Sequence, residues 1–264
     1  MDSVHVNTYS GLVYKYRQAS TGNEINEFTR RMITDQELWF SERRSFNDPF
    51  ELLPNMDDID EGGMVEMARE VLTSAQFDEA IIKNIFKNYE KLDATTKDMM
   101  KNFSISQVAG KTRICCFSKD PLNILMWSYY GDNHFGLCMG FDTNKDKKTF
   151  TPMLEVNYDE NMERTKVSTI DLIKGKQSTW GITHTKSHIW SHEKEVRTIK
   201  LDTDQNIFKY KKEALVELIF GCNVADEVID GYIKLLKDHD YMHVKIRRAA
   251  KHLKDYSLIL EELS

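Results

Sequence analysis

The charged side chains of residues 193–197, which read EKEVR, are those whose types and spacing most suggest catalysis. In a strand, side chains two positions apart share a face, so Glu193, Glu195 and Arg197 would project together at steps of about 7 Å. Carboxylates in such a row would stabilise the positive charge that develops on a sugar when its glycosidic bond breaks. The alternative is an exposed edge strand in which Glu195 and Arg197 merely pair with each other.

Histidines and cysteines suggest two other kinds of chemistry. His184, His188 and His192 recur every four residues, which would align them on one helix face and let two of them bind zinc or iron with a carboxylate. A surface cluster of histidines is the alternative, because the string lacks the HExxH motif. Cys116 or Cys222 could act as a nucleophile beside a histidine, although we expect these thiols to be structural.

The stretch 114–142 contains the elements that would form an apolar wall beside such a site. Its first strand spans 112–118, and Asp120 can cap a helix that starts at Pro121 and ends at a left-handed Gly131. The helical spacing predicts a buried stripe of Leu122, Leu125, Met126 and Tyr129. Trp127 and Tyr130 would then face another direction.

The returning strand of this stretch, 135–141, has two different faces. Its large apolar side chains share one face, whereas the other face consists of Gly136, Cys138 and Gly140. A strand face of small residues lets a ligand approach the backbone closely. We therefore predict that 114–142 forms one wall of a ligand cleft.

The rest of the chain predicts one mixed α+β domain that spans 1–264 and has at least seven strands. Further strands are expected at 12–17, 37–41, 153–158, 193–201, 214–221, 242–246 and 256–260, and helices at 24–33 and 226–237. Between the second strand and residue 112, the region of about 63–108 has helical periodicity throughout. It predicts an all-helical insertion.

Composition narrows the class of protein. The 264 residues are 41% hydrophobic, which is ordinary for a globular protein. A net charge of -6 argues against coating nucleic acid by charge alone, although the basic residues of 245–254 could contact phosphates. The glycine-rich phosphate loops GxxxxGK[ST] and GxGxxG are absent from the sequence. Without a signal peptide, a membrane-length apolar run or paired CxxC motifs, we expect a cytoplasmic protein with free thiols and no membrane partner.

Five segments together resemble a mainly bacterial family of uncharacterised proteins, domain of unknown function 2971. They are YKYR (14–17), LWFSERRSFNDPFE (38–51), CFS (116–118), MWSYYGDNHFGLCMGFD (126–142) and WSHEKEVR (190–197). FNDPFE and WSYYGDNHFG are the specific signatures, and the resemblance extends from residue 14 to about 221. The family carries no activity with it.

The order of these segments is also similar to that of ADP-ribosyltransferases, which implies a largely antiparallel, split β-core with a helical insertion. That resemblance implies that Tyr16 or Arg17 on the first strand would bind NAD. Phe117 and Ser118 at the end of the second strand, with Trp127 and Tyr130, would line the nicotinamide pocket. Glu195 would be the catalytic glutamate and Glu193 the carboxylate on the acceptor side. Further candidates, for the acceptor side or as structural parts of the motifs, are Asn47, Asp48, His134 and Arg197.

The leading functional hypothesis is therefore an enzyme that transfers ADP-ribose from NAD to a protein or nucleic acid, as a toxin or defence effector, without a metal. One alternative is a module that senses a nucleotide or a peptide without turning it over. Another is a metal-dependent hydrolase that uses His184, His188 and His192.

Overall fold

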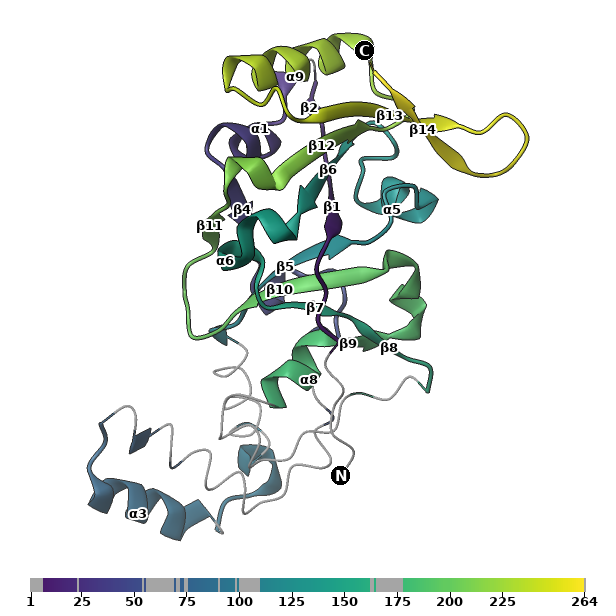
Figure 1. The fold of residues 1–264 in the computed structure, drawn as a ribbon. Coiled ribbons are helices and arrows are strands. Elements are labelled where there is room, and N and C mark those ends of the chain that lie inside the picture. The colour runs from purple at the N-terminus through teal and green to yellow at the C-terminus, as the bar shows by residue number, and fades with distance from the viewer. Residues whose placement is uncertain are drawn as a thin grey trace.

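The computed structural model describes residues 7–22, 24–53, 110–161, 164 and 178–263, and within 55–99 it describes 55, 69, 72–73, 76–89, 91–97 and 99. Figure 1 shows the fold. About half of the predicted insertion at 63–108 lies within the described residues, and it includes helix α3 (Glu79–Tyr89). No helix of the described residues is long and apolar enough to cross a membrane.

An eight-stranded sheet, in the order β14-β13-β12-β6-β1-β5-β10-β7, organises the described residues. Its strands are β1 (Leu12–Arg17), β5 (Arg113–Ser118), β6 (Leu137–Asp142), β7 (Met153–Glu155), β10 (Glu195–Lys200), β12 (Leu215–Phe220), β13 (Lys245–Lys251) and β14 (Leu258–Glu262). Within this sheet β12 and β13 run parallel, and the other neighbours run antiparallel. The prediction of a mixed α+β fold with a largely antiparallel core is confirmed.

Short strands and helices flank this sheet. The short strands pair as β2 (Ser20–Thr21) with β3 (Glu24–Ile25), β4 (Glu37–Trp39) with β11 (Ile207–Lys209), and β8 (Asn157–Asp159) with β9 (Thr185–Ser187). The α-helices are α1 (Glu27–Thr34), α5 (Ile124–Tyr129), α6 (Lys147–Phe150), α8 (Ser178–His184) and α9 (Asp226–Asp238). The 3₁₀ helices are η1 (Arg43–Ser45), η2 (Thr143–Asp146), η3 (His188–Glu193) and η4 (Lys212–Ala214).

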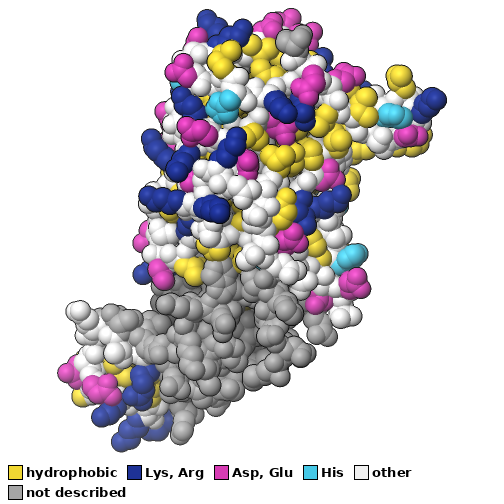
Figure 2. Space-filling view, in the orientation of Figure 1, with side chains coloured by type: hydrophobic (Ala, Val, Ile, Leu, Met, Phe, Trp, Pro, Cys, Tyr) yellow, Lys and Arg dark blue, Asp and Glu magenta, His cyan; other side chains and the backbone are white. Residues whose placement is uncertain are grey.

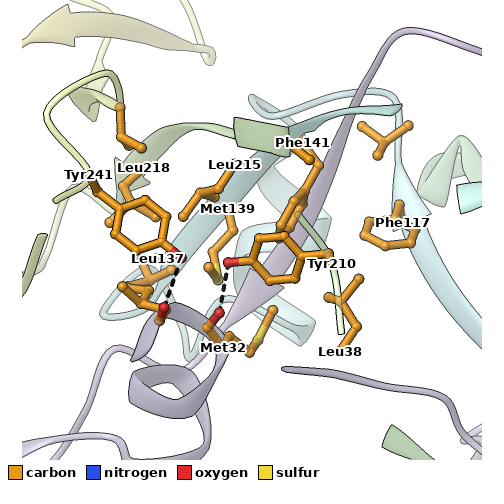
Figure 3. Packing of buried hydrophobic residues seen from close by; sticks show 14 of the residues in the cluster. Met32, Leu38, Phe117, Leu137, Met139, Phe141, Tyr210, Leu215, Leu218 and Tyr241 are labelled. Atoms are coloured by element: carbon orange, nitrogen blue, oxygen red, sulfur yellow. Dashed lines mark hydrogen bonds between the residues drawn. The ribbon is translucent and has the colours of Figure 1, made fainter. Parts of the chain in front are cut away.

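Apolar side chains are buried on both faces of the sheet. On one face Leu137, Met139 and Phe141 of β6 pack in a cluster to which α1 and α9 contribute. Figure 3 shows how tyrosines close this cluster: the hydroxyl of Tyr210 donates to the Met32 carbonyl at 2.7 Å, and that of Tyr241 to the Ile33 carbonyl. On the other face Tyr14 and Tyr16 of β1 pack with Met126, Trp127 and Cys138. The alternation of β1 therefore separates two cores.

Strands β1 and β5 are neighbours in the sheet but pair over a short length. Strand β1 pairs with β6 at every position from Leu12 to Arg17, but it pairs with β5 at Tyr14 and Ser118. Beyond that point the ammonium of Lys15 bridges the two strands by donating to the Cys116 carbonyl at 3.0 Å. The described strands nevertheless form one eight-stranded sheet, and the split core that the resemblance implies stays a prediction.

The two outer strands of the sheet differ. Residues 7–9 run along the free side of β7, where Tyr9 N–H donates to the Met153 carbonyl and Glu155 N–H to the Asn7 carbonyl. At the opposite end, no described strand pairs with the outer side of β14. The turn between β13 and β14 projects from the body with Leu253 (98%) and Tyr256 (104%) fully exposed. Figure 2 shows this projection as an arm with mixed apolar, basic and acidic side chains.

The predicted helix in 114–142 begins later than expected. Asn123, not Asp120, is its N-cap and accepts from Leu125 and Met126 N–H groups, whereas Asp120 accepts from Leu122 N–H within a preceding turn. Because the segment before Asn123 is not helical, the predicted stripe is wrong. Leu125 and Tyr129 are exposed, and Trp127 is fully buried.

The glycine face of β6 does not admit a ligand, because other parts of the chain fill it. A Cβ on Gly140 would lie 2.5 Å from Cγ of Glu217, and one on Gly136 would lie 2.3 Å from the Arg17 carbonyl oxygen. The predicted left-handed Gly131 is also wrong: Asp132, Asn133 and His134 carry positive φ angles in that turn instead.

Candidate functional site

A pocket of about 320 Å³ lies between β1 and β5, and we call it the split pocket. Its walls are β1, β5, the segment 41–47 and Tyr130. Lys186, Glu193 and Glu195 close it. Of the residues predicted from the sequence, the pocket brings together Tyr16, Arg17, Asn47, Phe117, Ser118, Tyr130, Glu193 and Glu195.

Four predicted residues do not line this pocket. Trp127 lies beneath it, with its ring edge-on to Tyr16 at 5.0 Å and its indole N–H donating to the Pro121 carbonyl. His134 stacks on the far side of Trp127 at 6.3 Å. Asp48 accepts from Phe50 N–H and shapes the loop after η1. Arg197 lies behind the two glutamates and has no exposed surface.

Glu193 and Glu195 converge by a different route from the one predicted. Glu195 begins β10, but Glu193 ends η3, and Lys194 between them is left-handed at φ 44°. The strand alternation predicted for Glu193 is therefore wrong. The Lys194 turn is held by its N–H bond to the Ser191 carbonyl and by the pairing of its ammonium with Asp120 at 2.8 Å. It returns Glu193 to the side of the pocket that Glu195 faces.

Arg197 joins Glu195 to a third carboxylate, Glu51. Its guanidinium donates two hydrogen bonds to Glu195, both of 2.8–2.9 Å, and two to Glu51, of 2.6 and 2.9 Å. A further bond of 2.7 Å goes to the Thr183 carbonyl. All three charged side chains are buried, so the alternative of an exposed charge row is wrong. The planar guanidinium of an arginine has forked N–H donors, so it can bind two carboxylates at once with two hydrogen bonds to each.

Lys186 bridges the two glutamates that face the pocket. Its ammonium lies 2.6 Å from Glu193 and 3.4 Å from Glu195. The other oxygen of Glu193 accepts from the Tyr130 hydroxyl at 2.6 Å, and that hydroxyl accepts from the Asn47 amide at 2.8 Å. A continuous series of contacts thus runs from Asn47 to Glu51, and it passes through Tyr130, Glu193, Lys186, Glu195 and Arg197.

The two glutamates have pKa values shifted in opposite directions. Burial, followed by repulsion from Glu195, raises the pKa of Glu193. Burial also opposes ionisation of Glu195, but Arg197 and Lys186 outweigh it and lower the pKa of Glu195. A pair of carboxylates with divergent pKa values is the arrangement that divides proton transfer from charge stabilisation.

Cations occupy the opposite wall of the split pocket. Lys15 and Arg17 lie two positions apart on β1, and the Lys15 ammonium lies 5.2 Å from the Phe117 ring centroid. Nε of Arg17 is buried and has no hydrogen-bond partner among the described residues. Burial lowers the pKa of the Arg17 guanidinium, and the opposing interactions with Cys115 and Tyr232 do not offset the loss of water. An anion placed here would offset that loss.

Glu51, Lys15 and Lys186 take part in the site, although no sequence pattern singled them out. Glu51 ends the FNDPFE signature, which marked the segment but not the role of its glutamate. Lys15 lies within YKYR, and only its place on the first strand beside Arg17 could have indicated it. Lys186 lies on the three-residue strand β9, which is too short to give a local signal.

The described residues support neither the metal site of three histidines nor the cysteine nucleophile considered from the sequence. His184 ends α8, whereas His188 and His192 belong to η3, so the predicted alignment on one helix is wrong. The described residues contain no group of three His, Cys, Asp or Glu side chains that could hold a metal ion. The four cysteines are free. Cys116 lines the split pocket, but burial and then Glu195 raise the pKa of its thiol, which keeps it protonated.

Comparison with known proteins gives one match. No curated protein and no solved structure matches the chain. Residues 126–198 match the family model described as Protein of unknown function (DUF2971). That segment begins in α5 and ends in β10, so it includes Tyr130, Lys186, Glu193, Glu195 and Arg197 but not the cations of β1. The resemblance inferred from the sequence is thereby confirmed over this part of the chain, which matches the DUF2971 family.

Proposed function

We propose that the protein is an ADP-ribosyltransferase-like enzyme that binds NAD in the split pocket. One observation supports this most strongly: two carboxylates of divergent pKa share Lys186 on one side of a pocket whose opposite wall carries Lys15 and Arg17. Acids on one side suit a sugar that becomes positively charged, and cations on the other suit a pyrophosphate. NAD carries both groups next to each other.

In the proposed reaction, the bond between the ribose C1′ and the nicotinamide nitrogen breaks, and its electron pair leaves on nicotinamide. Glu195, ionised because of Arg197 and Lys186, stabilises the positive charge that develops on the ribose. A nucleophile of the protein or nucleic-acid acceptor then forms the new bond to C1′, and Glu193 accepts its proton. The raised pKa of Glu193 suits a base that works near neutral pH. Tyr130 and Phe117 would line the nicotinamide.

The test is to incubate the protein with NAD and to measure both NAD binding and nicotinamide release. We expect release by the wild type and a loss of at least about tenfold in Glu195→Gln, since this variant lacks the charge opposite the ribose. Tyr130→Phe removes one hydroxyl, keeps both glutamates and should reduce release less. Glu261→Gln, an exposed change on β14, should match the wild type. A wild-type protein that neither binds NAD nor releases nicotinamide would overturn the proposal.

A second candidate is a module that senses a nucleotide without cleaving it. It is favoured by the hydrogen bonds that already occupy both oxygens of Glu193 and both oxygens of Glu195 in the free protein. In this case the network would fix the walls of the pocket, and the glutamates would not take part in a reaction. It predicts that NAD raises the unfolding temperature without forming a product, and that Tyr130→Phe retains this stabilisation. Product formation would reject it.

A further inference from the structure

A second pocket of about 320 Å³ shares Lys15 and Arg17 with the split pocket. Its other walls are α1 and the β4–β11 pair, which contribute Phe28, Arg31 and Trp39. We call it the Trp39 pocket. Because the same two side chains of β1 line both, a single ligand that lies across Lys15 and Arg17 would reach into each pocket.

The charges that line the Trp39 pocket favour an anion. Lys15, Arg17 and Arg31 are three cations, and they face one carboxylate, that of Glu37. Glu37 pairs with Arg31, which is also 3.8 Å from Asp35, so the charge of Arg31 is largely offset. Lys15 donates to a neutral carbonyl, and Arg17 has a buried Nε without a partner. The two cations shared by the pockets are thus those without a paired carboxylate among the described residues.

Aromatic side chains at the mouth of the Trp39 pocket add a second kind of contact. Phe28 is 68% exposed and Trp39 is 51% exposed, although both belong to regular elements that bury their other faces. Exposed aromatic rings beside unpaired cations are the surface that stacks a base and binds its phosphates.

We infer that the Trp39 pocket binds the base and the phosphate of a nucleotide, with the phosphate on Lys15 and Arg17 and the base against Phe28 and Trp39. If NAD binds in the split pocket, this inference assigns its adenosine half to the Trp39 pocket. To that extent the inference rests on the proposed function. The binding of a mononucleotide by the pocket itself does not require that any reaction occurs.

The test is isothermal titration calorimetry with AMP, adenosine and inorganic pyrophosphate as separate probes. We expect AMP to bind more tightly than either fragment, and its affinity to fall with added salt, since the phosphate contacts are ionic. Trp39→Ala should weaken AMP binding at least about fivefold, as the loss of base stacking implies. Arg17→Met should weaken AMP and pyrophosphate but leave adenosine unchanged. Tyr256→Ala, which removes an aromatic ring from the exposed turn, is the matched control and should bind like the wild type.

The outcomes separate this inference from the proposed function. AMP binding that depends on Trp39, in a protein that does not cleave NAD, upholds the pocket and rejects the enzyme. NAD cleavage whose KM is unchanged in Trp39→Ala and Phe28→Ala upholds the enzyme and overturns the pocket. Equal binding of AMP and adenosine, or equal binding by Trp39→Ala and the wild type, also overturns the inference.

Discussion

At the scale of residues, the site depends on a guanidinium that is shared between two carboxylates. Arg197 uses its donors on Glu51, Glu195 and the Thr183 carbonyl, so its charge is matched although it has no exposed surface. Such a charge is stable only while its partners remain, because removing one leaves an uncompensated ion in the interior. Glu51 comes from the loop after η1 and Glu195 from β10. Arg197 therefore also fixes that loop to the sheet.

Replacing Arg197 by methionine should strongly destabilise the protein. The variant would leave Glu51 and Glu195 buried beside each other, and breaking a buried ion pair costs about 3–5 kcal/mol. Urea unfolding followed by tryptophan fluorescence measures the change. Arg30→Met is the matched control, since Arg30 forms an exposed pair with Glu27 on α1, and its unfolding midpoint should stay close to that of the wild type. Similar midpoints for the two variants would contradict the assigned role of Arg197.

The two glutamates of the split pocket should affect stability with opposite dependence on pH. The pKa of Glu193 is raised on folding, so its contribution is fully present below the unfolded pKa of about 4.3 and is lost as the pH rises through the folded value. The pKa of Glu195 is lowered, so its contribution is present above about 4.3 and is lost as the pH falls through the folded value.

Relative to the wild type, Glu193→Gln should therefore become more stable as the pH rises above about 4.3. Glu195→Gln should become less stable, relative to the wild type, as the pH rises toward about 4.3 from below. Unfolding temperatures measured from about pH 3 to pH 8 compare the slopes, and a constant offset from lost hydrogen bonds does not matter. Parallel slopes for the two variants would show that the glutamates do not have divergent pKa values.

At the scale of elements, short connections rather than long helices position the site. Asn123 caps α5 with its side-chain oxygen and donates to the His192 carbonyl with its nitrogen, so it ties α5 to η3. The Ser118 hydroxyl donates to the Glu193 carbonyl at 2.7 Å and ties β5 to the same turn. These bonds hold Tyr130 and Glu193 at a distance at which their side chains meet.

Gly140→Ala should destabilise the contact between β6 and β12. A Cβ at this position would lie 2.5 Å from Cγ of Glu217, whose carboxylate accepts from the Tyr14 hydroxyl and from Arg247. Overpacking of this kind costs about 1–3 kcal/mol, and it should also displace Tyr14, which lines the split pocket. Chemical denaturation compares this variant with Gly110→Ala, where the added methyl meets open space. Equal stability of the two variants would contradict the packing described for β6.

Alternation and periodicity predicted the elements whose structure depends on their own residues. They failed where contacts with distant segments determine the start of an element or the burial of a side chain. The 12–17 strand and the 226–237 helix are formed as expected, because each carries its own local pattern: alternation between two cores in the strand, and one buried face in the helix. Trp127 was assigned to the wrong face because the start of α5 depends on Asn123 and its partner on η3. The hairpin of β2 and β3 was missed, since two residues per strand give no period. Of the site, Glu195 was found from its spacing, whereas Lys186 and Glu51 reach it only through folding.

At the scale of the whole molecule, the sheet divides the site between strands that contribute to both apolar clusters and strands that contribute to one. Strands β12, β6 and β1 lie in the interior of the sheet and contribute to apolar clusters on both faces. Strands β5, β10 and β7 follow beyond β1 and contribute to one of these clusters, and β10 carries Glu195. The cations of β1 and Glu195 of β10 therefore belong to different sides of one division in the sheet.

Hydrogen exchange should reveal this gradient along the sheet. Amides of β6 and β12, which are paired on both sides and buried, should exchange most slowly, and those of β14 and the turn at 252–257 should exchange first. Mass spectrometry of peptides after a series of exchange times measures the order. Protection of the turn equal to that of β6 would mean that the exposed arm is not free in solution.

The unequal outer strands have a consequence for aggregation. Residues 7–9 occupy the side of β7, whereas the outer side of β14 has no partner among the described strands. Within the described part of the eight-stranded sheet, β14 is thus the outer strand that can take a partner, and joining two molecules through β14 would use this edge in both of them. Backbone pairing through these strands would stop at a pair of molecules, whereas a chain with two open ends could extend into a fibre.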